Sequence, residues 1–202
     1  MDASQLQDPS IQTPDQIEFS LLNLINFKDT STFHHSNRVA ALTYEWAQFM
    51  RSRSKWLDIN VSGLVMAARL HDVGKVGVVE RVLSKAGPLT AEERLQMNLH
   101  VEIGYELVRD LPMAEGLALA VLHHHERWDG GGYPAGLQGE QIPLFAQIIG
   151  IVDAYDAMTS DRSYQKARSS LEALDEINRG AGRQFSPGLT SEFNQFLHAR
   201  NG

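Results

Sequence analysis

The chain has 202 residues, of which 43% are hydrophobic, a formal net charge of −7 and no cysteine; this length and composition predict a single domain with a sizeable core and exclude global disorder. Without cysteine there can be no disulfide, zinc ribbon or thiol nucleophile, so any metal must bind to histidine and carboxylate, as suits a cytoplasmic protein. The acidic charge argues against general nucleic-acid binding, and we expect neither a signal peptide nor a membrane segment, because no apolar run is long enough.

Residues 1–12 are polar and lack periodicity, so we expect a flexible tail before a single domain of residues 13–202. Thr13, Pro14 and Gln16 predict the start of a helix, as its cap, first-turn residue and capping-box partner. This helix should run to about Phe27 and bury Ile17, Leu21, Leu24 and Ile25.

A second helix is predicted from about Thr32 to Met50, and His35 shares its side with the core-facing residues. A single buried histidine usually serves a structural hydrogen bond, so this position does not by itself predict a site. Ser62 should cap a short apolar helix, residues 64–70, that delivers His71 and Asp72 at its C-terminal end.

The segment His71-Asp72-Val73-Gly74-Lys75 combines groups that bind metal and phosphate. Imidazole and carboxylate are both ligands of first-row metals, and a carboxylate can bridge two ions. Gly74 permits a sharp turn that could point the ammonium of Lys75 at an anion beside the metal. The alternative is that the His-Asp pair only makes a capping contact at a helix end.

Residues 78–83 read as a connector, and a capping box at Thr90 predicts a helix to about Arg109 that carries His100. An apolar helix from Met113 should end in His123-His124-His125. Neighbours on a helix point about 100° apart, so at most two of these histidines need to face one site. The alternative is a solvated surface run.

Residues 128–137 form a glycine-rich loop, which is either a cluster of turns or a place where the backbone approaches a ligand closely. Pro143 should start the most apolar helix, in which Asp153 is buried or half-buried and needs a cationic partner. Arg162 follows in a cationic turn, and two more helices, residues 169–178 and 187–198, complete an all-α domain of roughly seven to nine helices.

Seven ligand-type side chains thus lie in separate helices or helix ends, mostly on apolar sides. They are His35, His71, Asp72, His100, His124, His125 and Asp153. Such a set suits two ions that share a bridging carboxylate, the arrangement used for in-line displacement at phosphorus. A single ion would leave several of these groups unsatisfied.

Over residues 31–190 the sequence resembles the HD-GYP family, a branch of the HD phosphohydrolases. The matching segments are His35-Ser36-Asn37-Arg38-Val39, residues 71–75, His100 with Gly104, residues 124–130, Gly132-Tyr133-Pro134, Ile142-Pro143 and residues 153–162. The His-Asp pair alone is typical of the superfamily, whereas the Gly-Tyr-Pro segment is typical of this branch.

The resemblance implies a helical bundle with two, sometimes three, iron or manganese ions that hydrolyses cyclic di-GMP in bacterial signalling. By position, the seven side chains above would be the metal ligands, with Asp72 as the bridge and His123 as a surplus histidine. Lys75 would act in catalysis, Lys75 and Arg162 would hold phosphate oxygens, and Tyr133 would line the nucleotide pocket. The hydroxide that attacks phosphorus would be activated by the metal ions.

Two positions depart from the family. Ser31 stands where some members have a metal-binding glutamate, and Gln165 stands where members often have a lysine or arginine. We therefore expect two ions, and the linear dinucleotide pGpG as the main product. Two alternatives are a receptor or interaction module without catalysis and an HD phosphohydrolase of another nucleotide. The sequence leaves signalling partners and oligomeric state open, a dimer being one alternative.

Overall fold

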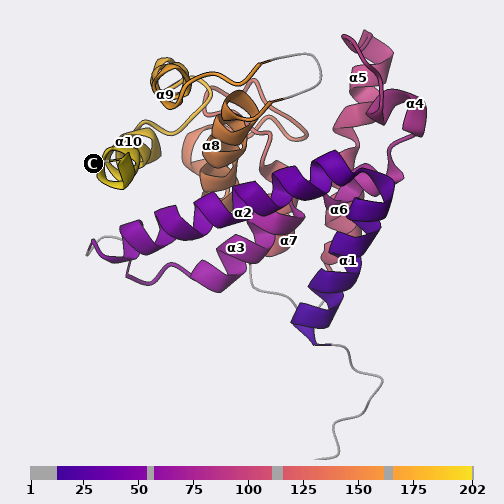
Figure 1. The fold of residues 1–202 in the computed structure, drawn as a ribbon, viewed down its shortest axis with the longest axis horizontal. Coiled ribbons are helices and arrows are strands. Elements are labelled where there is room, and N and C mark those ends of the chain that lie inside the picture. Colours follow the sequence, from indigo (N-terminus) through magenta and orange to yellow (C-terminus); the bar gives the residue numbers. More distant parts are fainter. Residues whose placement is uncertain (1–12, 54–56, 111–115, 162–165, 202) are drawn as a thin grey trace, which may run out of the picture.

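The computed structural model describes residues 13–53, 57–110, 116–161 and 166–201, and over these ranges it consists of helices and loops without a β-strand (Figure 1). The α-helices are α1 (Pro14–Lys28), α2 (Thr30–Arg51), α3 (Val61–Leu70), α4 (Glu80–Leu83), α5 (Ala91–Asn98), α6 (His100–Val108), α7 (Leu117–His123), α8 (Leu144–Thr159), α9 (Ser170–Arg179) and α10 (Pro187–Asn201). In the described part of the chain the connections also contain the 3-10 helices η2 (Val73–Gly77) and η3 (Gly139–Gln141). The prediction of an all-α fold is confirmed.

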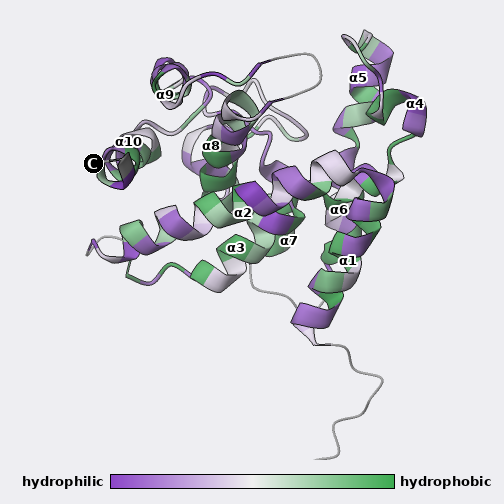
Figure 2. Ribbon diagram, in the orientation of Figure 1, coloured by the Kyte–Doolittle hydropathy of each residue, from purple (hydrophilic) through white to green (hydrophobic). Residues whose placement is uncertain are grey.

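The long helix α2 crosses the molecule and packs against α3 and α8, while α6 packs against η2 and α7 (Figure 1). Figure 2 shows hydrophobic residues along α3 and α8, and buried residues of α3, α7 and α8 form part of the core. At one end, the ring of Trp46 in α2 packs edge-on against Phe193 in α10, with centroids 4.8 Å apart. None of the helices in the described ranges is long and apolar enough to cross a membrane.

The predicted helix starts at Thr13 and Thr90 are confirmed, because both residues form capping boxes with the residue three positions later. Two other details were wrong. Leu24 is 54% exposed, since α1 turns this side away from the bundle. The cap of α3 is Asn60, whose Oδ1 accepts from the amide of Gly63, so the helix begins before the predicted cap Ser62.

The helix predicted from Thr90 to Arg109 is divided into α5 and α6 at Leu99. The break leaves the carbonyl of Met97 near the end of α5, where it accepts a hydrogen bond from Nδ1 of His100 over 2.7 Å. The expected connector over residues 78–83 also contains the single turn of α4. These two differences account for the additional short helices.

Close backbone packing brings η2 against α6. A Cβ atom on Gly74 would lie 1.9 Å from the carbonyl oxygen of His100 and 2.4 Å from the amide of Gly104. No side chain fits in that space, so glycine is required for this approach. The contact brings Asp72, two residues before Gly74, close to His100, the first residue of α6.

Candidate metal centre

Three of the predicted ligand histidines lie at helix ends, where main-chain carbonyl groups lack partners within the helix. Nδ1 of His71 donates to the carbonyl of Ala68 over 2.7 Å, and Nδ1 of His124 donates to that of Val121 over 2.8 Å. His100 makes the same bond to Met97 at the end of α5. In each ring the proton is therefore fixed on Nδ1, and Nε2 is left to bind a metal ion.

The structure brings all seven predicted ligands into two adjoining groups. Within each group, one ligand atom from each residue lies within 4.8 Å of the others. The groups are His35, His71 and Asp153, and Asp72, His100, His124 and His125. Five separate parts of the chain supply them, so the bundle, and not a local motif, assembles the cluster.

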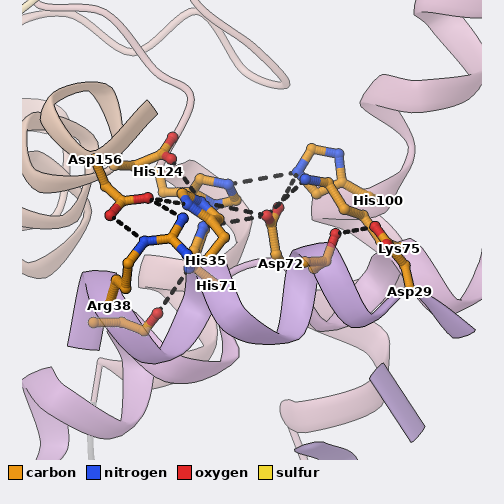
Figure 3. Close-up of polar contacts among 12 residues, drawn as sticks. Asp29, His35, Arg38, His71, Asp72, Lys75, His100, His124 and Asp156 are labelled. Carbon is orange, nitrogen blue, oxygen red and sulfur yellow. Dashed lines mark hydrogen bonds and ion pairs between the residues drawn. The ribbon is translucent and has the colours of Figure 1, made fainter. Parts of the chain in front are cut away.

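Asp72 joins the two groups. Its carboxylate is buried and lies between His100 on one side and His35 and His71 on the other (Figure 3). The Nε2 atoms of His71 and His100 are each 3.4 Å from a carboxylate oxygen of Asp72, and that of His35 is 3.9 Å away. A carboxylate in this position can bridge two ions.

The nitrogen atoms that face the cluster fit bound cations. Nε2 of His71 is buried and has no hydrogen-bond partner among the described residues. The Nε2 atoms of His100 and His124 lie 3.5 Å apart. Since both rings donate through Nδ1, two lone pairs face one another in the neutral state, and a cation between them would remove the repulsion.

The pKa values of the histidines in the second group favour this neutral state. Burial lowers the pKa of His100 to about 4, although Asp72 acts in the opposite direction. Burial, together with the neighbouring histidines, lowers the pKa of His124 well below its usual range. The pKa of His125 is also lowered, chiefly by burial. Neutral imidazole is the form that binds a metal ion.

His35 and Asp153 meet from α2 and α8, with Nε2 of His35 2.9 Å from Oδ1 of Asp153. Burial lowers the pKa of His35, but hydrogen bonds to Asp153 and Asp156 outweigh this effect and raise it to about 9. Burial raises the pKa of Asp153, yet the same bond to His35 leaves it well below its usual range. The prediction that Asp153 is at least half-buried is confirmed, and its nearest described partner is the His35 ring.

The other predicted site residues are placed in part. Nζ of Lys75 donates to Oδ2 of Asp72 over 2.6 Å, and the ring of Tyr133 lies against that of His125 with centroids 5.0 Å apart. Tyr133, His125 and Asp153 line a cavity of about 260 Å³ beside the cluster. Arg162 and Gln165 lie outside the described residues.

Sequence reasoning gave no role to His123 beyond being surplus, and it missed Glu126. The carboxylate of Glu126 accepts from the amides of Ala135 (2.8 Å) and Leu137 (3.1 Å), and Nδ1 of His123 lies 3.5 Å from it. This buried carboxylate holds the glycine-rich loop closed, so that Tyr133 faces His125. The available signal was a glutamate directly after a run of three histidines.

Comparison with known proteins agrees with this geometry. Residues 20–189 match the HD domain family. The chain is 36% identical over 181 residues to a cyclic di-GMP phosphodiesterase of Thermotoga maritima, covering 87% of this chain and 48% of that protein. It is 39% identical to a cyclic di-GMP phosphodiesterase of Vibrio cholerae (90% and 39% covered) and 33% identical to a 3'3'-cGAMP-specific phosphodiesterase of the same organism (88% and 34% covered).

Solved structures show the same fold. A cyclic GMP-AMP-specific phosphodiesterase of V. cholerae aligns with a TM-score of 0.61 at 20% identity, over 90% of this chain and 48% of that one. An HDG"Y"P protein of Bdellovibrio bacteriovorus aligns with a TM-score of 0.64 at 16% identity, over 93% and 71%.

The chain belongs to the HD domain family, and Gly132-Tyr133-Pro134 places it in the HD-GYP branch. It spans less than half the length of the curated relatives described above.

Proposed function

We propose that the protein is a metal-dependent phosphodiesterase that hydrolyses cyclic di-GMP, mainly to the linear dinucleotide pGpG. The observation that carries this proposal is the pair of ligand groups joined by the buried carboxylate of Asp72. The cofactors would be two divalent ions, iron or manganese, because the ligands are imidazole and carboxylate and no thiolate is present. The names of the similar phosphodiesterases support the substrate class.

The chain's own residues would act mainly by holding and orienting charge. Ions bound by these residues would supply hydroxide at neutral pH and would neutralise charge that develops on the phosphoryl oxygens. Asp72 would hold both ions, and Lys75 would add a positive charge beside the scissile phosphate. Tyr133 would contact the nucleotide in the adjoining cavity, and Arg162 would hold a second phosphate oxygen.

A mixed guanine-adenine cyclic dinucleotide is a second candidate substrate. Some of the similar proteins are named for 3'3'-cGAMP, at 33% or 34% identity, a level that overlaps with that of the cyclic di-GMP enzymes. Both substrates carry two phosphodiester groups in one ring and could present one of them to the ions in the same way. The preference for one substrate over the other would then depend on the nucleotide bases, which would bind in the cavity beside Tyr133.

Chromatography of products tests the proposal. Protein loaded with Mn²⁺ or Fe²⁺ is incubated with cyclic di-GMP, 3'3'-cGAMP, cyclic di-AMP and a mononucleotide panel, with Asp72→Ala as the inactive control. We expect pGpG from cyclic di-GMP. Cleavage of 3'3'-cGAMP alone would favour the second candidate. Tight binding of cyclic di-GMP without any product from metal-loaded protein would contradict catalysis and support a receptor.

A further inference from the structure

His35 differs from the three histidines at helix ends in the partner of its Nδ1 atom. Their Nδ1 atoms donate to main-chain carbonyl groups three residues earlier. Nδ1 of His35 instead lies 2.7 Å from Oδ2 of Asp156, a carboxylate on α8 that is 121 positions away in the chain. The orientation of the His35 ring therefore depends on a second helix.

Asp156 is in turn held by Arg38, which follows His35 by three residues on α2. Nε of Arg38 donates to Oδ1 and Nη2 donates to Oδ2, both over 2.8 Å, so the pair is bidentate (Figure 3). Oδ1 also accepts from the hydroxyl of Ser160 over 3.2 Å. Every described contact of this carboxylate is with a donor, and a bidentate pair fixes its orientation.

This arrangement determines what His35 can offer to a metal ion. A carboxylate paired with arginine only accepts hydrogen bonds, so the proton must lie on Nδ1 of His35. Nε2 then faces Asp153 at 2.9 Å, on the side of His71. A carboxylate behind a ligand histidine also makes the imidazole a stronger donor to the metal than a carbonyl does.

We propose that Arg38 and Asp156 are positioning residues for one of the two ions, the one held by His35, His71 and Asp153. This inference rests on the proposed metal-dependent function. The ion held by Asp72, His100, His124 and His125 should not depend on them, because the Nδ1 partners of His100 and His124 lie in their own segments. A purely structural role, as an ion pair joining α2 to α8, would affect folding without distinguishing between the two sites.

The test is a calorimetric titration of chelator-treated protein with Mn²⁺, without substrate. Wild-type protein should show two sites. Asp156→Ala should weaken one of them by about 10- to 100-fold and leave the other within about twofold. Asp156→Asn, which keeps an oxygen that can accept from Nδ1, should recover part of the loss. Arg38→Gln should weaken the same site by a smaller factor.

Glu18→Gln and Arg69→Gln are matched controls. Nη1 of Arg69 donates to the buried carboxylate of Glu18 over 2.8 Å and joins α3 to α1, but neither residue belongs to the cluster. Both controls should bind Mn²⁺ as wild type does. If Asp156→Ala does not fold, the Mn²⁺ affinities of Asp156→Asn and Arg38→Gln test the inference instead.

Unchanged affinities at both sites in folded variants, or equal weakening of both sites, would overturn the inference. Failure of the wild-type protein to bind Mn²⁺ would instead contradict the proposed metal-dependent function.

Discussion

Nζ of Lys75 lies 2.6 Å from Oδ2 of Asp72, the carboxylate that joins the two groups of ligands. Burial raises the pKa of Asp72, but Lys75 and His71 outweigh it and hold this pKa well below its usual range. The carboxylate is thus ionised before any metal arrives. If Asp72 binds cations as proposed, the ammonium of Lys75 would be free to contact a phosphate.

Lys75→Met should therefore impair substrate handling and spare the metals. A charge-assisted contact is worth about 1.5 to 3 kcal/mol, so kcat/KM should fall roughly tenfold to a hundredfold while metal content stays normal. Steady-state kinetics measure kcat/KM, and elemental analysis of the same preparation measures the metal content. Lys28→Met, which removes a surface ion pair with Glu80, is the control. Full activity in Lys75→Met would contradict a contact between Lys75 and the substrate phosphate.

Asp72→Ala should remove more metal than any other single change in the cluster, because its carboxylate faces both groups. We expect wild-type protein purified without chelator to carry about two ions per chain and the variant to carry one or none. Elemental analysis tests this, and chelation followed by addition of Mn²⁺ should abolish and restore activity. A variant that retains both ions would show that Asp72 is not the bridge.

The stability of chelator-treated protein should fall in alkaline solution. The pKa of His35 rises on folding from 6.5 to about 9, so folding is favoured by the protonated ring. This contribution is fully present below pH 6.5 and is lost as the pH rises through about 9. Unfolding temperatures measured across this range should converge for wild type and His35→Gln at high pH. His198→Gln, at an exposed position in α10, should follow the wild-type curve.

The product of hydrolysis should depend on Ser31, which is exposed on α2 one turn before His35. A hydroxyl is a poorer ligand than a carboxylate for a hard cation, so a third ion should be absent or weakly held. We expect pGpG to accumulate and its cleavage to GMP to be slow. A time course for wild type and Ser31→Glu measures this, and Ser31→Glu should raise the proportion of GMP. GMP that appears as fast as pGpG in wild type would show that two ions suffice.

Gly74→Ala should destabilise the protein, since the added methyl group would overlap the carbonyl of His100. Overpacking of this kind costs typically 1–3 kcal/mol, and here the obstacle is backbone, so we expect about 3 kcal/mol or more. Denaturant unfolding measures the change. Gly87→Ala is the matched control, because a Cβ atom there has no neighbour within 4 Å. Equal stability of the two variants would mean that η2 can move away from α6.

Local signals in the sequence predicted much of the fold. Thr13 and Thr90 mark helix starts because a capping box involves only residues three positions apart. The exposure of Leu24 could not be predicted, since it depends on how α1 packs against the bundle. The break at Leu99 also lacked a local signal, because no proline or glycine marks it.

The candidate site depended on tertiary structure to a greater degree. Each histidine could be assigned to a helix, but the meeting of His35 with Asp153 required either the fold or a resemblance to a family. The sequence did contain a local signal that Asp156 and Arg38 lie near the site. Each lies three residues after a proposed ligand on its own helix, a spacing that places two side chains on the same face.

The groups that meet at His35 and Asp153 come from distant parts of the sequence, on α2 and α8, and the chain has no cysteine with which to join them covalently. An ion bound there would act as a removable cross-link that closes a loop through most of the bundle, and it would lower the entropy of the unfolded chain as a disulfide does. It could form only after α8 has been synthesised, so the growing chain should acquire this ion late, when α2 and α8 have already packed together.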